Sequence, residues 1–442
     1  MSDTSQVKIK FFTREQDENL QQIQDAPLYA PVTLKRYGLS EIVNHLLKLD
    51  KRVPFDFLID GELLTSTLDD YLVTNGLSSE VLLNLEYKRA VLPPSYLNSF
   101  NNDDWISSLD HYDTTIISGS YDGIVRTWDL SGQVKKQYSG HSAPVRCVKY
   151  ISDTRLVSGG NDRTLRLWKT KSDSNTNNEG DEIEEGKTLA ILEGHKAPVV
   201  SCAVDNNRIL SAAYDNTICV WSTNYKEMSL IDPMDESTNN TNVGSTAAKK
   251  RRKLALKDGS IRRRSPLAIL ESHSSPVEDV IFDHNDTTVA YSVSQDHTIK
   301  TWDLVTNRCV DTKSTSYSLL SILQLPQINL LACGSSARHI TLHDPRTTTK
   351  VTNAQLIGHK NFVVSLSDCP TNQYMFASGS HDGTVKLWDV RSNKPLYTIT
   401  REQDSVGLSS DDKKVFSCDW TEKIGIVSGG QDKKIQINKE NF

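Results

Sequence analysis

Short apolar runs separated by polar turns fill most of this chain, and the same order of runs returns seven times. Each unit consists of an apolar strand, a tight turn and a second strand that ends near a tryptophan. In residues 374–389, the runs Met-Phe-Ala and Val-Lys-Leu-Trp flank the turn Gly-Ser-His-Asp-Gly. Asp-Gly between two β-rich runs is a strong signal for a hairpin. The pattern therefore predicts a series of antiparallel sheets.

The spacing within the units is nearly constant. A serine or cysteine is followed ten residues later by the tryptophan position, usually with an aspartate midway, and this position holds Trp128, Trp168, Trp221, Trp302 and Trp388. The fifth and seventh units are degenerate and hold His343 and Asn438 instead. The shortest intervals between units match a four-stranded propeller blade. We predict a seven-bladed β-propeller, with disordered insertions at about 171–187 and 224–266.

A histidine precedes the aspartate in four of the units. The pairs are His141 and Asp162, His195 and Asp215, His273 and Asp296, and His359 and Asp382. This pattern resembles the WD-repeat family, in which His, Asp, Ser and Trp form a hydrogen-bonded set inside each blade. A Ser/His/Asp set also suggests a serine hydrolase, but a catalytic triad is needed only once. Because the set recurs from blade to blade, we predict that it is structural.

The last unit needs an outer strand from elsewhere in the chain, because only four residues follow Asn438. A long exposed edge strand would be an aggregation liability. The stretch Ser95–Phe100 is otherwise unassigned and lies in a proline-containing linker at 93–102. We expect it to pair with the seventh blade and to close a propeller that occupies 103–442.

Residues 1–92 do not follow the repeat. Val7, Ile9 and Phe11 alternate with lysines, as in a half-buried strand, and Ser40 is a candidate helix cap. The other predicted elements are strands at 31–35, 55–59, 63–64 and 81–87 and a helical turn at 67–71. This order matches that of ubiquitin, so the chain is predicted to be mainly β, with a small α+β ubiquitin-like domain before the propeller. No diglycine tail follows the domain, so we expect a docking module.

Composition restricts the class of protein. The chain has 442 residues, a hydrophobic content of 37% and a net charge of −6. No apolar run approaches the ~18–20 residues of a membrane helix, and the start lacks a signal-peptide pattern, so we expect no membrane association and no secretion. The seven cysteines contain no CxxC motif. We therefore expect reduced thiols, no cofactor and no metal of the protein's own.

Positive charge is concentrated in residues 249–264, which carry nine positive charges and one negative charge. We expect a nuclear-import signal formed by Lys249, Lys250, Arg251, Arg252, Lys253, Arg262, Arg263 and Arg264. A solvated charge run and an RNA phosphate contact are the alternatives. No aromatic residues interleave these charges, so stacking with bases is not indicated.

Specific segments carry a closer resemblance. Gln6–Arg14, Arg36–Val43, Val53–Phe57 and the proline linker are similar to the Ytm family of ribosome-biogenesis factors. The resemblance covers essentially the whole chain. It implies a non-catalytic assembly factor of the nucleus, nucleolus and nucleoplasm, acting in rRNA processing and maturation of the large (60S) subunit within its 66S precursor. The propeller would bind a Bop-type WD-repeat protein, in the trimeric PeBoW complex with a Pescadillo-type protein.

The same resemblance implies that the ubiquitin-like domain docks on the metal site of midasin, an AAA ATPase that releases the factor. A site of this kind leaves one metal position open for a partner's carboxylate, because hard cations prefer oxygen ligands. Glu80, in an exposed turn before the last strand of the domain, matches the family's motif position. Asp60 and Glu62, at another turn, are lesser candidates.

Three other readings stay open at this stage. An enzyme would need nonrepeating polar residues that converge in the propeller channel. A WD40 substrate adaptor of a ubiquitin-ligase pathway would bind ligase or proteasome subunits through its amino-terminal domain. A direct RNA-binding scaffold would bind RNA with a steep salt dependence that requires residues 249–264.

Overall fold

A computed structural model describes residues 5–15, 17, 19–23, 26–49, 51–170, 184–205, 207–231, 261–347, 354–401 and 413–439. The chain contains two compact units, formed mainly by residues 1–93 and by residues 94–439. In the described part of the chain, no helix is long and apolar enough to cross a membrane.

The described residues of the amino-terminal unit form one five-stranded sheet and two helices. Its strands are β1 (Gln6–Phe12), β2 (Leu28–Pro31), β3 (Phe55–Ile59), β4 (Glu62–Leu63) and β5 (Leu82–Arg89). Its helices are α1 (Arg36–Leu47) and α2 (Leu68–Thr74). The strand order is β2-β1-β5-β3-β4, with β1 and β5 parallel, which is the order of the ubiquitin fold. Leu39 and Val43 of α1 are buried in one core with Val7 and Ile9 of β1.

Two sequence predictions for this unit were wrong. The second strand lies at 28–31 rather than 31–35, and α1 begins at Arg36, so Ser40 is inside the helix and does not cap it. The Ser40 hydroxyl instead accepts the Phe55 N–H at 3.1 Å. Asn44, one turn later, exchanges two hydrogen bonds with the backbone of Val53, at 2.7 and 2.8 Å. The polar side chains inside α1 therefore attach the helix to the start of β3.

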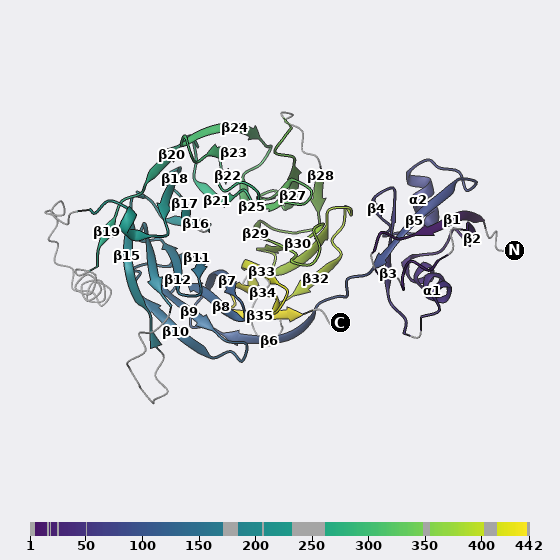
Figure 1. The fold of residues 1–442 in the computed structure, drawn as a ribbon, viewed down its shortest axis with the longest axis horizontal. Helices are drawn as coiled ribbons and strands as arrows, with labels where there is room; N and C mark the ends of the chain where they lie inside the picture. The colour runs from purple at the N-terminus through teal and green to yellow at the C-terminus, as the bar shows by residue number, and fades with distance from the viewer. Residues whose placement is uncertain are drawn as a thin grey trace. The chain divides into compact units, whose positions relative to one another are not determined.

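The second unit is a ring of sheets, and seven of them are present among the described residues (Figure 1). The inner strands, in blade order, are β7 (Ile106–Tyr112), β11 (Val145–Ser152), β16 (Val199–Val204), β21 (Val277–Phe282), β25 (Leu319–Leu325), β29 (Val363–Asp368) and β33 (Val415–Thr421). The second strands are β8 (Thr115–Ser120), β12 (Arg155–Gly160), β17 (Arg208–Ala213), β22 (Val289–Ser294), β26 (Leu330–Ser335), β30 (Met375–Ser380) and β34 (Gly425–Gly430).

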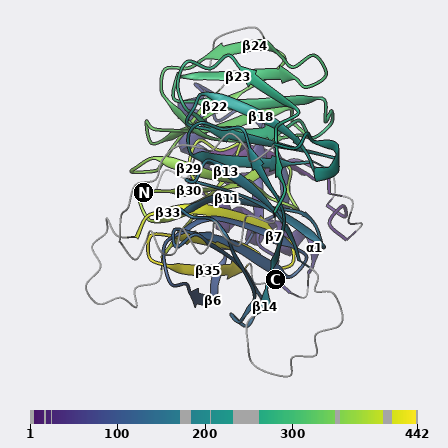
Figure 2. The same cartoon turned by 90° about the vertical axis from the view of Figure 1, so that its left-hand side faces the viewer.

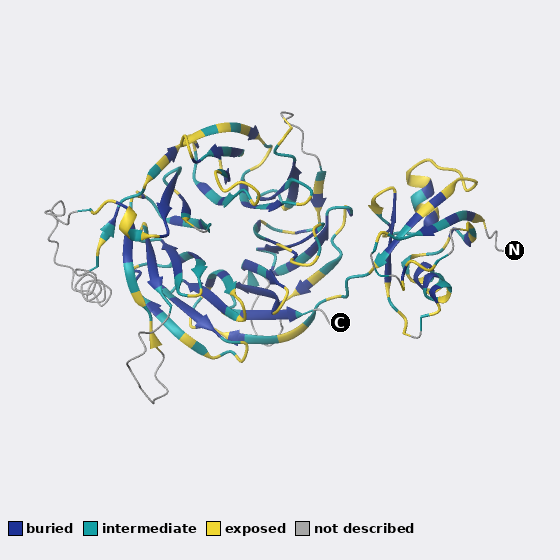
Figure 3. Cartoon of the chain, in the orientation of Figure 1, coloured by how far each residue is buried: buried dark blue, intermediate teal, exposed yellow. Residues whose placement is uncertain are grey.

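The third strands are β9 (Ile124–Trp128), β13 (Thr164–Lys169), β18 (Thr217–Ser222), β23 (Thr298–Asp303), β27 (His339–His343), β31 (Thr384–Asp389) and β35 (Lys434–Lys439). The outer strands are β10 (Val134–Ser139), β15 (Lys187–Glu193), β20 (Ala268–Glu271), β24 (Arg308–Ser314), β28 (Ala354–Ile357), β32 (Tyr397–Thr400) and β6 (Ser95–Asn101). The second and third strands are the most buried, as the dark blue in Figure 3 shows. Apolar side chains of neighbouring blades pack face to face, so each blade is held by the two beside it.

The ring is closed by the strand that was expected to close it. β6, from the start of the repeat region, pairs antiparallel with β35, from its end, and Figure 2 shows the two strands together. Phe100 of β6 is buried and stacks on Trp128 of the first blade, with the ring centroids 6.3 Å apart. On the channel side, the Leu109 N–H donates to the Ser417 hydroxyl at 3.0 Å. The two ends of the repeat region are therefore joined both at the outer strand of the seventh blade and between the inner strands β7 and β33.

Parts of the predicted disordered insertions have regular structure. In the insertion between β13 and β15 of the second blade, β14 (Glu184–Glu185) is formed and pairs with β10 of the first blade. In the longer insertion, η1 (Tyr225–Glu227) and β19 (Arg263–Arg264) are formed, and β19 adds a fifth strand to the second sheet. The prediction of disorder was therefore wrong at these ends. Residues 171–183 and 232–260, including Lys249, Lys250, Arg251, Arg252 and Lys253, lie outside the described residues.

Candidate docking surfaces

The repeated histidine and aspartate pairs form a hydrogen-bonded set in each of the four blades that contain them. In the second blade, His141 Nδ1 lies 2.8 Å from the Asp162 carboxylate and Nε2 lies 2.8 Å from the Ser158 hydroxyl. The Trp168 indole N–H donates to the same hydroxyl at 2.8 Å. A carboxylate only accepts hydrogen bonds, so Nδ1 carries the proton and Nε2 accepts from Ser158. Burial opposes the charge on Asp162, but His141 and Thr164 lower the pKa of its carboxyl to about 2.

Three further blades repeat the set with the same partners. They use His195, Asp215, Ser211 and Trp221; His273, Asp296, Ser292 and Trp302; and His359, Asp382, Ser378 and Trp388. The four serines are fully buried. A hydroxyl that a substrate cannot reach is not a nucleophile, although its hydrogen bonds resemble those of a catalytic triad. The geometry therefore favours a structural role for the set.

Replacing Asp382 with Ala should lower the free energy of unfolding of the propeller by on the order of 1–3 kcal/mol, because it leaves His359 and the Lys360 N–H without their acceptor. Hydrogen bonds from His359 and Thr384 outweigh burial and lower the pKa of the Asp382 carboxyl. The carboxylate therefore contributes fully to the free energy of unfolding above its pKa in the unfolded chain, which is near 4. This contribution is lost as the pH falls through its lower pKa in the folded chain. Urea unfolding at pH 7 and pH 3 measures this; an equal difference at both pH values would contradict the assignment.

Two blades without the histidine keep parts of the set by other means. In the seventh blade, Arg401 takes the place of the histidine: Nη2 and Nε donate to the two oxygens of Asp432, at 2.7 and 2.8 Å, and Nη1 donates to the Ser428 hydroxyl at 2.7 Å. In the first blade, Trp128 still donates to Ser118, at 2.8 Å. Sequence reasoning missed Arg401. It lies 31 residues before Asp432, which is farther than the histidines of the other blades lie from their aspartates.

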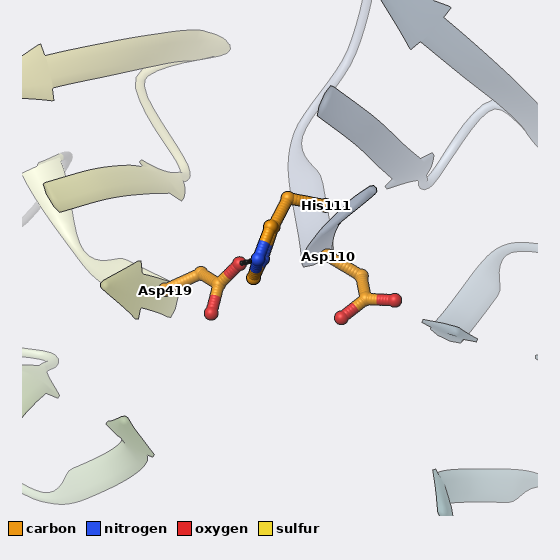
Figure 4. A group of neighbouring side chains, drawn as sticks. All are labelled: Asp110, His111 and Asp419. Carbon is orange, nitrogen blue, oxygen red and sulfur yellow. Dashed lines mark hydrogen bonds and ion pairs between the residues drawn. The ribbon is translucent and has the colours of Figure 1, made fainter. Parts of the chain in front are cut away.

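The inner strands enclose a channel with a volume of about 1070 Å³. At the face where these strands end, Asp110, His111 and Asp419 gather from β7 and β33 (Figure 4). His111 Nδ1 lies 2.5 Å from Asp419 Oδ2, and this hydrogen bond is the main cause that raises the pKa of His111. Asp110 accepts from the Lys149 ammonium at 2.9 Å and from the Tyr150 N–H at 2.6 Å.

The ligand atoms of Asp110, His111 and Asp419 lie within 4.8 Å of one another, which is close enough to consider a metal site. Each carboxylate, however, already has a partner that a metal ion would have to displace. The inner strands face the channel as sheet edges, and Asp110 satisfies a backbone N–H of the next blade. We therefore interpret the cluster as a connection between the first blade and its two neighbours, and propose no metal centre there.

The amino-terminal unit presents a different surface between α2 and β5. Residues 73–82 are all exposed, and Glu80 lies in the turn just before β5. Thr67 caps α2 with a capping box, and the Leu77 N–H donates to the Leu72 carbonyl at 2.9 Å, so the segment leaves the helix in a defined direction. Among the described residues, no hydrogen bond or ion pair engages the Glu80 carboxylate. It is therefore available as a ligand.

Apolar side chains accompany this carboxylate. Val73 is 74% exposed, and Leu77, Val81 and Leu82 are also exposed, on either side of Glu80 in the sequence. Exposed apolar groups in one short segment, next to an unpaired charge, are typical of a surface that is covered by a partner. Asp60 and Glu62, also exposed, flank the Gly61 turn between β3 and β4. The structure therefore places the three sequence candidates on two separate turns.

Of the three arginines at the end of the basic segment, Arg262 is exposed, Arg263 is partly buried and Arg264 is buried. Arg263 pairs with Glu193 at 3.0 Å. Arg264 is buried, and its guanidinium donates to the Met228 carbonyl at 2.6 Å. Including Arg264 in an exposed import signal was therefore wrong. The contacts of Arg264 connect the two ends of the insertion.

The propeller holds its four Ser/His/Asp sets in buried positions, and the ubiquitin-like unit presents an exposed carboxylate. This combination is typical of proteins that dock on other macromolecules. The family model of the NLE (NUC135) domain matches residues 7–72, and the model of the WD domain, G-beta repeat, matches residues 95–129, 132–169, 186–222, 264–303 and 350–389. Proteins described as "Ribosome biogenesis protein YTM1" are similar over the full length. The one from Vanderwaltozyma polyspora is 70% identical, covering 99% of this chain and 98% of the relative, and the one from Kluyveromyces lactis is 69% identical with the same coverage.

The chain belongs to this family of ribosome biogenesis proteins. A more distant member, from Scheffersomyces stipitis, is 63% identical over 99% of the chain. Among solved structures, the WD40 beta propeller domain of Doa1 aligns with a TM-score of 0.59 and 19% identity, covering 79% of this chain and 98% of that one. At this identity the similarity concerns the fold alone.

Proposed function

We propose that this protein is a non-catalytic assembly factor that takes part in rRNA processing and maturation of the large (60S) ribosomal subunit, within the 66S precursor in the nucleolus and nucleoplasm. Its full-length similarity to ribosome biogenesis proteins supports the process. The four Ser/His/Asp sets are buried and repeated, which favours a scaffold over an enzyme. A propeller offers macromolecular partners two faces and a rim at once.

The two units have separate roles in this proposal. The propeller binds a Bop-type WD-repeat protein, in a trimeric complex with a Pescadillo-type protein. The ubiquitin-like unit gives the Glu80 carboxylate to the open metal position of the AAA motor midasin, which then releases the factor. The single observation that carries the second role is the unpaired Glu80 carboxylate within the exposed apolar segment 73–82.

Removal of the amino-terminal unit tests this division of roles. The truncated chain must still contain β6, because β6 closes the ring. A chain that starts at residue 94 keeps β6 and therefore the outer strand of the seventh blade. We expect it to co-purify with preribosomal particles, to accumulate on them by at least about twofold, and to fail to bind the motor. Quantitative affinity purification with mass spectrometry measures both effects.

A truncation that starts at residue 103 is the matched control, because it removes β6 as well. Unlike the residue-94 chain, it should no longer associate with preribosomal particles, because the ring is then open at β35. Normal release of the residue-94 chain from particles would contradict the role of the ubiquitin-like unit. Failure of the full-length chain to associate with preribosomal particles would contradict the proposed function itself.

A further inference from the structure

Aromatic side chains gather along one side of a mouth of the channel. The inner strands begin at this mouth, and their first residues pair with the last residues of the second strands, as Ile106 pairs with Ser120 and Val363 with Ser380. We call this side of the ring the entry face. The mouth cluster consists of Trp105, Tyr121, Arg146, Phe362, His381 and Phe416, and all of these except Trp105 line the cavity.

The rings of the mouth cluster form one continuous contact across blades. Trp105 and Tyr121 of the first blade lie 5.4 Å apart, and each lies within 6.3 Å of Phe416 of the seventh blade. The His381 ring lies 5.4 Å from the Phe416 ring and 6.0 Å from the Phe362 ring. All of these distances are measured between ring centroids. The cluster therefore spans the seam at which the ring is closed.

These rings are only partly covered, although they pack together. Phe362 is 43% exposed and Trp105 is 37% exposed. Arg146 extends over the Tyr121 ring, and its guanidinium donates to the Tyr121 hydroxyl at 2.6 Å. Tryptophan, tyrosine and arginine at the centre of a face are the residue types that dominate the binding energy of protein interfaces.

Charge indicates which partner fits. Arg146 is joined by Lys414, two residues before Phe416, and the charges of both act on His381 of the cluster. Burial, and then the positive charges of Lys414 and Arg146, lower the pKa of His381 to about 4. The cations at the mouth cluster are therefore Arg146 and Lys414. The Glu278 carboxylate lies close enough to Arg146 for their charges to interact, and its hydrogen bonds come from Gln295 and Tyr214.

The channel beneath the cluster has the opposite charge. Its lining contains seven carboxylates, of Asp110, Asp205, Glu278, Asp279, Asp283, Asp368 and Asp419, but only the two cations Arg146 and Lys149. The whole chain also has a net charge of −6. A polyphosphate backbone would be repelled by this field, whereas one or two carboxylates could reach Arg146 without entering the channel.

We propose that the mouth cluster is the docking site for an acidic segment of a partner protein, in which a carboxylate meets Arg146 and an adjacent apolar or aromatic side chain packs on Phe362 and Trp105. This inference rests on the proposed function in one respect: the partner is taken to be a protein of the preribosomal particle. Because the site spans the first, second, sixth and seventh blades, a bound segment also holds the seam closed.

A photo-crosslink decides the class of partner. The full-length chain, with Phe362 replaced by p-benzoylphenylalanine, is expressed in cells, and preribosomal particles are purified after irradiation. We expect a crosslink to a protein segment that has at least two Asp or Glu residues near the site of attachment. The same analogue at Val310, on the exposed outer strand β24, is the control position.

A crosslink to RNA, to a basic segment, or to nothing while Val310 still crosslinks would overturn the inference. None of these outcomes would affect the proposed function, because the particles themselves are recovered in each case. Loss of the particles with the unmodified chain would instead contradict the proposed function.

Peptide binding gives an independent test of the charge. Capped hexapeptides of sequence Ala-Leu-X-X-Phe-Ala, with X as Glu, Gln or Lys, are titrated against the full chain by ligand-observed NMR. We expect the Glu peptide to bind at least about fivefold tighter than the Gln peptide. Arg146→Gln should remove most of that difference, and Phe362→Ala should weaken both peptides by about threefold or more.

Lys423→Gln is the matched charge control, because Lys423 is exposed in the turn that follows the inner strand β33, on the other face of the ring. It should leave the preference for the Glu peptide unchanged. Melting temperatures within about 2 °C of the wild-type value establish that the variants are folded. Equal binding of the three peptides, or tighter binding of the Lys peptide or of oligouridine, would overturn the inference.

Discussion

Glu80→Ala should abolish metal-dependent binding of this protein to the AAA motor, with a loss of affinity of at least about 100-fold. The open position of a divalent metal needs an oxygen ligand, and Ala supplies none. The fold should be unaffected: Glu80 is exposed, so the free energy of unfolding should change by no more than about 0.5 kcal/mol. Calorimetric titration against the motor's metal-site domain with magnesium, and then with EDTA, measures the effect.

Two carboxylates on another turn of the same unit are the controls for Glu80. Asp60→Ala and Glu62→Ala remove the same charge from the turn between β3 and β4, and both should bind within about threefold of the wild type if Glu80 is the ligand. Leu77→Ser should weaken binding more moderately, by about tenfold, because Leu77 belongs to the exposed apolar segment. Retained magnesium-dependent binding by Glu80→Ala would eliminate Glu80 as the metal ligand.

Arg401→Ala should give the largest loss of stability, about 3–5 kcal/mol, because it leaves Asp432 as a buried charge without its partner. The guanidinium is almost fully buried and binds Asp432 through two nitrogens, so water cannot replace it. It also donates to the Lys434 carbonyl at 2.6 Å, at the start of the strand that pairs with β6. The ring should therefore open first at the seventh blade.

The control for Arg401 is an arginine of the same type at the surface. Arg346→Ala breaks an ion pair with Asp344 in which the arginine side chain is 66% exposed, and it should cost no more than about 1 kcal/mol. Urea unfolding of each variant, with hydrogen exchange in β6 and β35 to locate the opening, distinguishes the two cases. A stability of Arg401→Ala equal to that of Arg346→Ala would rule out its role as the substitute for histidine.

The blade network shows why the repeated residues could be predicted. Each His, Asp, Ser and Trp lies within one hairpin or its preceding loop, so their spacing is nearly constant, as in His359 and Asp382. The seventh blade has no histidine at that spacing, and Arg401 reaches Asp432 from a different distance along the chain. Sequence reasoning therefore assigned the regular blades and missed the substitute.

The amino-terminal unit illustrates a similar limit. Ser40 has the residue type of a helix cap, but its hydroxyl binds the Phe55 N–H of β3, fifteen residues away, and the helix begins earlier. Arg264 has the charge of an exposed signal, but it is buried against Met228, on the other side of the insertion. In both cases a tertiary contact overrode the local preference of the residue.

The sequence by itself determined the architecture of this protein, because a blade is a local unit whose apolar alternation, turn residues and network spacing recur within about forty residues. It also determined the closing strand, because an unpaired last blade requires a partner from the remaining chain. The tertiary structure alone decided that Arg401 replaces a histidine. It also decided that Trp105 and Phe416, from opposite ends of the propeller, meet at one mouth of the channel. Such groups depend on which blades become neighbours when the ring closes, and no local spacing records that.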